Sequence, residues 1–326
     1  MDYSFVIVSW NAKAFLRQCI DSIVADSSGL EIEVVVIDNA SSDGSPEMVQ
    51  DEYPWVMLVR NDANVGFARA NNQGIALSSG TYLCLVNSDV IVHPGCLTAM
   101  KEFLDRNPEI GLAGPRVLNA DGSLQRSCRQ APTLRSVVFR ALALDTLFRR
   151  SPVFGAHFMT HWDHDDVRAV DILSGCCWFA RRSAVADIGG LNEAFFMYGE
   201  DMEWSLRFRR GGWSVMFNPA ATITHYGGAS SSRQPTRFYV EMQRADLQYW
   251  RMHHGPASFA AYYGAVVLQH STRAAGHSLM WLVRPSGRER SATKVRGSVT
   301  CLARLLTLRL SPASGRQSAA SAVPAR

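Results

Sequence analysis

Residues 82–89 read Tyr82-Leu83-Cys84-Leu85-Val86-Asn87-Ser88-Asp89, an apolar run that ends in three polar side chains. Three similar apolar runs lie upstream, at residues 5–9, 34–37 and 57–59. Amphipathic stretches typical of helices separate the runs, at residues 14–24, 46–53 and 68–77. Strands that alternate with helices of this length predict βαβ units and an α/β fold with a mostly parallel central sheet.

Polar residues at the ends of these strands predict one ligand pocket, because ligands of open α/β sheets bind outside the carboxyl ends of the strands. The residues expected to share a wall of this pocket are Ser9, Asn11, Asp38, Asn39, Asn61, Asn64, Asn87, Ser88 and Asp89. A dinucleotide-binding dehydrogenase would need G-x-G-x-x-G after the first strand. The turn Ser9-Trp10-Asn11-Ala12-Lys13 contains no glycine, which excludes that class.

The composition bounds the class of protein and its location. With 326 residues, 47% of them hydrophobic, the chain can fill a substantial core. A formal net charge of only +4 argues against a nucleic-acid binder. The seven cysteines include no C-x-x-C pair, which favours a reducing cytoplasm. We find neither a secretory signal pattern nor the roughly 18 consecutive apolar residues of a membrane span, and therefore expect a cytoplasmic protein that can still lie on a membrane.

Two aspartates and one histidine at strand ends are candidates for ligand binding. Asp38 can accept hydrogen bonds from a ribose or a pyrimidine, although a simple capped turn uses the same residue types. Asp89 suits a divalent cation bound to a diphosphate, although an aspartate in a turn is commonly structural. His225 precedes two glycines that allow a tight turn to direct the imidazole inward, and a structural histidine is the alternative.

A cluster of acids in the stretch 199–203 is the candidate for catalysis. Glu200, Asp201 and Glu203 stand at the start of a helix expected over 202–209, where the helix dipole favours acids without any catalytic role. The aromatic run 195–198 precedes them and offers faces on which a sugar can stack. Three acids within four residues beside such side chains favour a site that contains a general base.

Taken together and in this order, these segments resemble family-2 glycosyltransferases with the GT-A fold, and most closely their rhamnosyltransferase-like branch. The matching segments are Val6-Ile7-Val8-Ser9-Trp10-Asn11, Asp38-Asn39-Ala40-Ser41-Ser42-Asp43-Gly44-Ser45, Asn64-Val65-Gly66-Phe67-Ala68-Arg69-Ala70-Asn71-Asn72, Asn87-Ser88-Asp89, Gly189-Gly190-Leu191-Asn192-Glu193-Ala194-Phe195-Phe196-Met197-Tyr198-Gly199-Glu200-Asp201 and His225-Tyr226-Gly227-Gly228. They cover roughly residues 4 to 230. The resemblance implies a mostly parallel central sheet flanked by helices, with a C-terminal helical extension.

For the donor, the resemblance implies that Ser9 and Asp38 hold the nucleoside and that the segment 64–72 flanks the donor. Within that segment Arg69 is either a donor contact or part of a solvated helix face. Asn87, Ser88 and Asp89 occupy the position of the family's D-x-D motif.

For the metal and the acceptor, the resemblance implies that Asp89 and His225 bind Mg²⁺ or Mn²⁺ on the diphosphate. Since Asn87 replaces the first aspartate of the motif without its charge, metal affinity would depend on those two ligands and on the donor phosphates. Asp201 would remove the proton from the acceptor hydroxyl, with Glu200 and Trp178 on the acceptor side.

The implied activity is that of an inverting glycosyltransferase that uses a nucleotide-sugar donor, with L-rhamnose from dTDP-rhamnose as the first expectation. The acceptor would be a glycan or a polyprenyl-linked sugar in cell-surface polysaccharide or cell-wall assembly. The same chemistry with a UDP-hexose or UDP-galactofuranose donor is one alternative. A catalytically inactive relative that binds sugar nucleotide or glycan is another.

We expect three parts along the chain: a catalytic domain over 1–235, a helical extension over 236–285 and a basic, largely flexible tail over 286–326. Apolar and aromatic residues of the extension are interspersed with basic ones: Phe259, Tyr262, Tyr263, Val266, Val267, Leu268, Arg273, His277, Leu279, Trp281, Leu282 and Arg284. A second apolar segment with arginines follows at residues 299–310. Such a mixture fits peripheral contact of these helices with the inner face of a membrane. Packing of the extension on the catalytic domain fits equally well.

Overall fold

The first strand, β1 (Tyr3–Ser9), pairs in parallel with β2 (Ile32–Asp38) on one side and with β4 (Tyr82–Asn87) on the other. A further parallel strand, β3 (Met57–Arg60), extends the sheet beyond β2. The connections are the helices α1 (Lys13–Asp26), α2 (Ser45–Glu52) and α3 (Phe67–Leu77). The predicted βαβ units and parallel sheet are therefore confirmed. The computed structural model describes residues 1–227 and 235–305.

Beyond β4 the sheet becomes mixed, with the order β3-β2-β1-β4-β11-β6-β12-β5. β11 is antiparallel to both of its neighbours, β12 runs parallel to β6, and β5 closes the edge. The strands of this half are β5 (Val90–Val92), β6 (Ile110–Leu118), β7 (Leu124–Gln125), β8 (Cys128–Arg129), β9 (Arg168–Ala169), β10 (Ile172–Leu173), β11 (Cys177–Arg181) and β12 (Ser214–His225). Helices α4 (Cys96–Arg106), α7 (Arg182–Ile188) and α8 (Glu200–Arg210) accompany them.

The two faces of the sheet are covered by separate apolar clusters, as the alternation along β1 demonstrates. Tyr3, Phe5 and Ile7 pack into one cluster, together with residues of α1, α2 and α4. Val6 packs into the other, together with residues of α3, α7 and α8. A strand buried on both faces reads as a continuous apolar run, which is why these strands were visible in the sequence. The seven cysteines are all buried free thiols.

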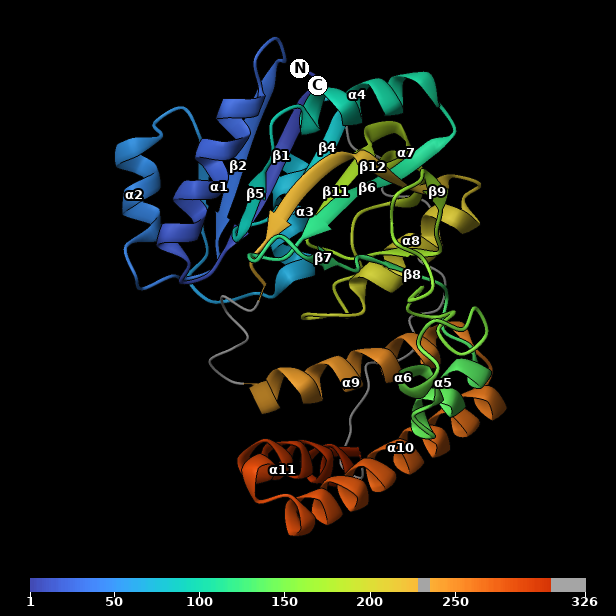
Figure 1. Ribbon diagram of the computed structural model, residues 1–326. Coiled ribbons are helices and arrows are strands. Elements are labelled where there is room, and N and C mark those ends of the chain that lie inside the picture. Colours follow the sequence, from blue (N-terminus) through green and yellow to red (C-terminus); the bar gives the residue numbers. More distant parts are fainter. Residues whose placement is uncertain (228–234, 306–326) are drawn as a thin grey trace.

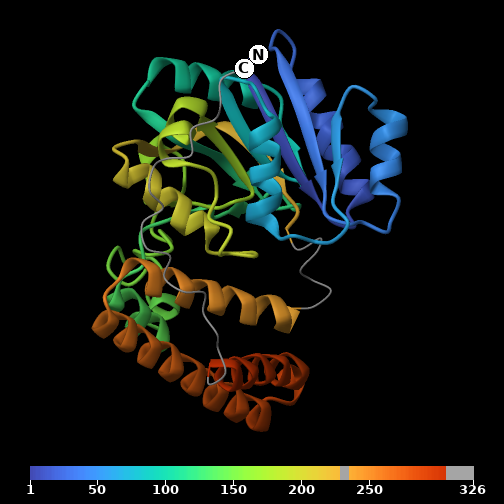
Figure 2. The same ribbon diagram turned by 180° about the vertical axis from the view of Figure 1, so that it is seen from behind.

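A layer of helices lies beside the carboxyl-terminal edge of the sheet (Figures 1 and 2). It contains α9 (Pro235–His253), α10 (Pro256–Val283), the 3₁₀ turn η1 (Pro285–Gly287) and α11 (Arg288–Leu305). In both views α9 lies between the sheet domain and the pair formed by α10 and α11. No helix within residues 1–227 and 235–305 is long and apolar enough to cross a membrane.

The structure divides the chain differently from the three parts expected. The short helices α5 (Leu134–Ala141) and α6 (Leu144–Leu147) belong to the range 1–235, yet they lie beside α10, and Val137 of α5 shares an apolar cluster with Trp250 and Tyr262. Hydrophobic patterns cannot reveal this placement, because the partner of α5 lies more than a hundred residues away in the sequence.

The expected flexible tail is wrong for its first part, since α11 is a helix packed on α10. Its buried residues are mostly small: Ser291, Gly297, Ser298, Cys301 and Leu305. A stripe of small side chains allows close packing but carries little hydrophobic pattern, so the sequence resembled a biased linker. Residues 306–326 lie outside the described residues.

Gly74 of α3 tests how closely this helix packs on the sheet. A Cβ at this position would lie 2.2 Å from Cγ1 of Val6 in β1. We expect Gly74→Ala to lower the free energy of unfolding by about 1–3 kcal/mol through overpacking, despite the better helix propensity of alanine. Denaturant unfolding measures the change.

Gly264 provides the matched control in α10, where no atom would lie within 4 Å of an added Cβ. Gly264→Ala should be stabilising by about 0.5–1 kcal/mol, because only the helix propensity changes. Equal effects of the two substitutions would contradict the close contact between α3 and β1.

Candidate active site

The proposed nucleoside end of the site lies where β1 and β2 finish side by side. Ser9 and Asp38 are register partners in the two parallel strands, and both side chains are buried. Oδ2 of Asp38 accepts a hydrogen bond from the backbone N–H of Ser41 at 3.0 Å. Its Oδ1, like the Ser9 hydroxyl, is buried without a partner among the described residues. A bound polar ligand could supply the hydrogen bonds that these two groups lack.

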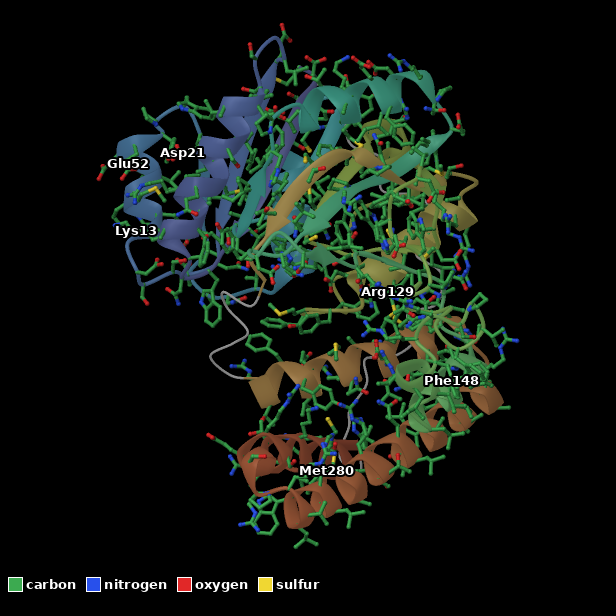
Figure 3. All side chains as sticks on the ribbon, in the orientation of Figure 1. Lys13, Asp21, Glu52, Arg129, Phe148 and Met280 are labelled. Carbon is green, nitrogen blue, oxygen red and sulfur yellow. The ribbon has the colours of Figure 1, made fainter. Side chains whose placement is uncertain are left out.

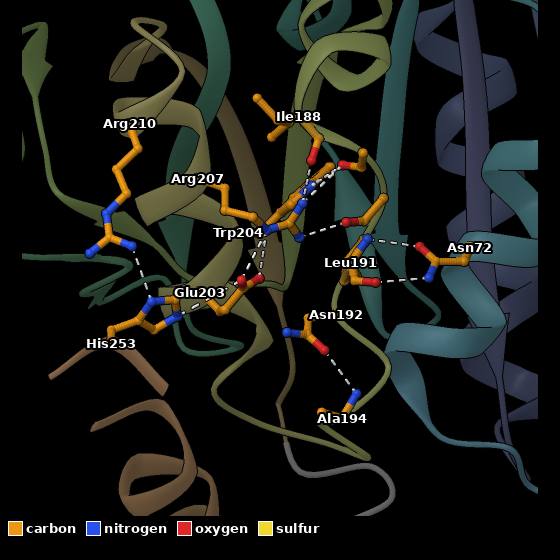
Figure 4. Close-up of polar contacts among 12 residues, drawn as sticks. Asn72, Ile188, Leu191, Asn192, Ala194, Glu203, Trp204, Arg207, Arg210 and His253 are labelled. Carbon is orange, nitrogen blue, oxygen red and sulfur yellow. Dashed lines mark hydrogen bonds and ion pairs between the residues drawn. The ribbon is translucent and has the colours of Figure 1, made fainter. Parts of the chain in front are cut away.

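Two of the sequence segments, 64–72 and 189–201, contact each other directly. The side-chain amide of Asn72 donates to the carbonyl oxygen of Leu191 at 2.9 Å and accepts from its N–H at 2.8 Å (Figure 4). Gly66 has a φ of +90°, and a Cβ there would lie 2.7 Å from the carbonyl oxygen of Phe196. Only glycine combines this conformation with such a close approach.

Arg207 of α8 fixes the loop that precedes this helix. Its guanidinium donates to Glu203 and to the carbonyl oxygens of Ile188 and Gly190, the last two at 2.6 Å (Figure 4). Glu203 therefore has a structural role, as its position at a helix start allowed. The ion pair anchors α8 and so positions the two acids in its first turn.

The candidate metal ligands, Asp89 and His225, lie next to each other. Asp89 belongs to the turn Ser88–Asp89 between β4 and β5, and His225 ends β12, which pairs with β5. Oδ1 of Asp89 lies 3.3 Å from Nε2 of His225, and the side-chain amide of Asn87 lies 3.3 Å from the same nitrogen. Sequence reasoning named all three residues, and the structure brings them together.

Gln125 of β7 determines which nitrogen of His225 carries the proton. Its side-chain N–H groups donate to Asn119 and to the backbone carbonyl of His225, so its Oε1 is directed at Nδ1 of the imidazole, 2.6 Å away. This hydrogen-bond network assigns the proton to Nδ1 and leaves the lone pair of Nε2 on the side of Asp89. A second hydrogen bond of this kind is typical of metal-binding histidines.

The donor set fits a divalent cation shared with a diphosphate. A carboxylate oxygen and an imidazole lone pair face each other at 3.3 Å, an arrangement that a cation or a proton stabilises. Among residues 1–227 and 235–305, no group of three His, Cys, Asp or Glu side chains could hold a metal ion. Mg²⁺ is commonly bound by one or two protein ligands together with substrate phosphates, which matches this pair.

The candidate base, Asp201, lies in the first turn of α8 and is only 8% exposed. Its Oδ2 forms an ion pair with the guanidinium of Arg129 from β8 at 2.5 Å. Figure 3 shows Arg129 between the sheet domain and α9. Gly199 directly precedes the helix, and a Cβ there would lie 2.9 Å from the Phe195 ring and 3.0 Å from Cβ of Ala245 in α9.

The adjacent acid, Glu200, has a raised pKa. Burial, followed by the negative charge of Asp201, raises the pKa of the Glu200 carboxyl to about 8. Its Oε2 is buried without a partner among the described residues. At neutral pH Glu200 is therefore protonated and able to donate a hydrogen bond, whereas the neighbouring Asp201 is paired with Arg129. Two neighbouring carboxyls in different environments are a common arrangement in catalytic sites.

Of two other residues expected to contact ligands, one is placed differently. Trp178 has no exposed surface and packs on Trp204, with its indole N–H bonded to the carbonyl of Leu173. It thus lies behind Glu200 and does not line the acceptor side, because its apolar ring completes the core. Arg69 is exposed on α3, a placement that fits either of the two roles predicted for it.

Two polar partners at the site were missed by sequence reasoning, namely Arg129 and Gln125. Both lie in the stretch between about residues 111 and 170, where the hydrophobic pattern is weak. They reach Asp201 and His225 through contacts 72 and 100 residues away in the sequence. We see no local pattern that would have revealed them.

Comparison with known proteins identifies the family and the fold. The family described as "Glycosyl transferase family 2" matches residues 4–189. The N-acetylglucosaminyl-diphospho-decaprenol L-rhamnosyltransferase of Mycobacterium tuberculosis is 32% identical over 215 residues, which are 63% of this chain and 69% of that protein. A low-salt glycan biosynthesis hexosyltransferase of Haloferax volcanii is 25% identical over 64% of this chain and 62% of its own length.

Solved structures share the fold at low sequence identity. A mannosyltransferase from Pyrobaculum calidifontis, in complex with GDP-mannose and Mn²⁺, is 16% identical, with a TM-score of 0.52 over 93% of this chain and 86% of that chain. GalNAc-T7 with UDP, GalNAc and Mn²⁺ is 14% identical, with a TM-score of 0.55 over 77% of this chain and 51% of that chain. The GT-A fold is thereby confirmed. The chain belongs to glycosyl transferase family 2, in its rhamnosyltransferase-like branch.

Proposed function

We propose that this glycosyltransferase inverts the anomeric centre of its donor sugar in a single displacement, with Asp201 as the general base. The observation that carries the proposal is the pair of carboxyls at the start of α8, of which Asp201 pairs with Arg129 and Glu200 has a raised pKa. A base that removes the proton from a bound hydroxyl permits direct attack, so no covalent intermediate with a second nucleophilic carboxylate is needed. The protonated Glu200 would donate a hydrogen bond to the acceptor.

On the donor side, Ser9 and Asp38 would bind the nucleoside through the polar atoms that have no partner. Asp89 and His225 would hold Mg²⁺ or Mn²⁺, which when bound supplies positive charge for the diphosphate leaving group. Asn87 and Ser88 would orient this turn towards the phosphates. The divalent cations in the related mannosyltransferase and in GalNAc-T7 support this assignment.

We infer that the donor is dTDP-L-rhamnose and the acceptor a polyprenyl-diphosphate-linked sugar. The activity of the mycobacterial relative supports both, since that enzyme is an N-acetylglucosaminyl-diphospho-decaprenol L-rhamnosyltransferase. Arg129 would help to bind such an acceptor, because a guanidinium that pairs with a carboxylate can also pair with a phosphate. Exchange of partners by Arg129 would free Asp201 to act as a base.

A membrane-linked acceptor requires contact with a lipid surface, and we propose that the end of α10 provides it. Leu279, Met280, Trp281, Leu282 and Val283 are consecutive and all exposed, the last two by 63% and 64%. Arg284, Arg288 and Arg290 follow directly. A continuous exposed apolar segment beside basic residues is typical of insertion at an anionic lipid surface. We call residues 279–283 the apolar tip; Met280 is labelled in Figure 3.

Other residues of α10 that sequence analysis grouped with this segment pack internally. Tyr262 and Val266 belong to a buried cluster, and Tyr262 stacks on Trp250 with ring centroids 4.3 Å apart. Internal packing and membrane contact, the two alternatives left open for the extension, would therefore apply to different parts of α10. Residues of its first half pack against neighbouring helices, and its exposed end would contact the membrane.

Substitution of the base provides the first test. We expect Asp201→Asn to reduce transfer by about 10²–10⁴-fold, the usual contribution of a general base, while donor binding is retained. Nucleoside diphosphate release with a panel of sugar nucleotides measures transfer, and thermal stabilisation by the donor measures binding.

Glu203→Gln is the matched control, because Glu203 is an acid of the same turn whose role is structural. This variant should lower stability through loss of the Arg207 ion pair but reduce turnover far less than Asp201→Asn. Comparable losses of turnover would contradict the assignment of the base. A parent protein that binds donor without any transfer would instead indicate an inactive relative.

The protonation of Glu200 predicts a specific dependence of stability on pH. The folded protein keeps this proton up to about pH 8, whereas the unfolded chain loses it near the ordinary value of 4.5. The contribution of this group to the free energy of unfolding therefore falls as pH rises across that window.

Glu200→Gln cannot lose a proton, so its stability relative to the parent should rise up to about pH 8 and then stay constant. Thermal unfolding across this range measures it. A difference independent of pH would show that Glu200 is already ionised in the folded protein.

If the apolar tip inserts into a bilayer, removing its apolar surface should weaken binding to vesicles. Leu279→Glu combined with Leu282→Glu should reduce sedimentation with anionic vesicles by at least about tenfold, because two leucines that become buried in the bilayer contribute several kcal/mol to insertion. Trp55→Glu, at an exposed position of the sheet domain, is the control and should bind as the parent does. Equal binding by all three proteins would contradict the proposed contact.

A further inference from the structure

A cavity of about 170 Å³ lies between α9, α10 and α11, apart from the residues assigned to transfer. Its lining residues are Thr236, Tyr239, Arg273, Thr293, Lys294, Gly297 and Ser298. Three of them carry aliphatic hydroxyls, two carry positive charge, and none is acidic. The walls are formed by the Tyr239 ring and, at Gly297, by backbone. A cavity with this lining offers hydrogen-bond donors and positive charge to an anionic group.

The two cations of this cavity lack acidic partners. Among the described residues, neither Arg273 nor Lys294 forms an ion pair; Arg273 lies 5.8 Å from the centre of the Tyr239 ring. The pKa of the nearby His277 is lowered by burial and next by the charges of Lys294 and Arg273. An uncompensated positive field of this kind attracts an anion.

One lining residue, Tyr239, carries a hydroxyl without a protein partner. This hydroxyl is buried and has no hydrogen-bond partner among the described residues, and burial raises its pKa, so it remains a hydrogen-bond donor. Its ring contacts the imidazole of His270, which has no exposed surface. Burial, followed by the charge of Arg273, lowers the pKa of His270 to about 4, so this neighbour adds no charge. The hydroxyl of Thr293 donates to the carbonyl oxygen of Glu289, whereas the Tyr239 hydroxyl is available to a ligand.

The position of the cavity indicates the source of the anion. Arg273 precedes the apolar tip on α10 by six to ten residues, which is about 9–15 Å along a helix. If the tip enters the acyl region of a bilayer, the cavity lies near the level of the lipid headgroups. In both overall views α9 separates α10 and α11 from the sheet domain, so this region is distinct from the site around Asp201.

We propose that this cavity binds the phosphate group of a lipid headgroup, as a monoester or a diphosphate, through Arg273, Lys294 and the hydroxyls of Tyr239 and Ser298. Such a group accepts several hydrogen bonds at once and carries up to about two negative charges, matching two unpaired cations. The proposal rests on the membrane contact proposed for the apolar tip. Binding there would orient the enzyme on the bilayer, with α9 between the lipid and the transfer site.

The test compares phosphatidylcholine vesicles that contain phosphatidate with vesicles that contain enough phosphatidylserine to give the same surface charge. The parent protein should prefer phosphatidate by about tenfold, since only phosphatidate presents a phosphate monoester. Arg273→Gln combined with Lys294→Gln should reduce this preference to less than about twofold. Arg290→Gln combined with Arg296→Gln removes equal charge from α11 outside the cavity, and should weaken binding to both vesicles while keeping the preference.

A second variant fills the cavity without changing its charge. A Cβ on Gly297 would make ordinary contacts with the Tyr239 ring, at 3.6 and 3.9 Å, so Gly297→Val should fold and lose the preference for phosphatidate. Inorganic pyrophosphate should displace the parent from phosphatidate vesicles more effectively than from phosphatidylserine vesicles.

Three outcomes would overturn the proposal. One is equal binding of the parent to phosphatidate and phosphatidylserine vesicles. Another is an equal loss of the preference for phosphatidate in the Arg273→Gln, Lys294→Gln variant and in the Arg290→Gln, Arg296→Gln control. Pyrophosphate that binds the parent in solution, without any preference for phosphatidate vesicles, would identify a soluble phosphate as the ligand. Vesicle binding through the apolar tip would persist in each case, so failure of the cavity and failure of the membrane contact remain distinguishable.

Discussion

Parallel pairing of β1 with β2 and with β4 is the constraint on which the donor side of the structure depends. The register aligns Ser9 with Asp38 and Val8 with Asn87, so three polar segments separated by dozens of residues finish at one edge. Because successive side chains of a strand point to opposite faces, a slip of one residue would exchange the buried and exposed sets. Burial of both faces makes such a slip costly, and the position of the polar ends is fixed by the same packing.

The acceptor side depends on the start of α8, where charge is distributed unequally over two adjacent carboxyls. Arg129 pairs with Asp201 and leaves Glu200 in an apolar environment beside Trp178 and Gly175. One carboxyl is paired with a guanidinium and the other is kept as a neutral acid by burial, although the two residues are neighbours in sequence. The Glu203–Arg207 ion pair and the close contact of Gly199 with α9 keep this turn in place.

Helix α9 connects the two halves of the molecule because it is apolar on two faces. Ala245 and Tyr249 pack against Phe195 and Met202 of the sheet domain, whereas Leu247 and Trp250 pack against α10. The same helix supplies Tyr239 to the proposed phosphate cavity and Ala245 to the start of α8. Because α9 contacts both regions, the orientation of the enzyme on a membrane would also set the orientation of the transfer site around Asp201.

The sequence by itself determined the parallel half of the sheet, the order of its helices and the residues at the strand ends. It could do so because continuous apolar runs and their polar ends are local patterns. It also named Asp89, His225 and Asp201, through six segments that are specific only in combination. Asn87 departs from the family motif, so the metal site predicted at Asp89 and His225 would depend on few protein ligands and on the donor phosphates.

Only the tertiary structure decided which partners act on these residues. Arg129 and Gln125 reach the site from a stretch with weak hydrophobic pattern, and Trp178 is part of the core. Strand β6 contains two glycines and a proline, residues that weaken the sequence pattern of a strand. Helix α11 was hidden by a stripe of small residues. In each case the deciding contact joins residues far apart in the chain, and neither periodicity nor propensity carries information about a partner that only folding brings near.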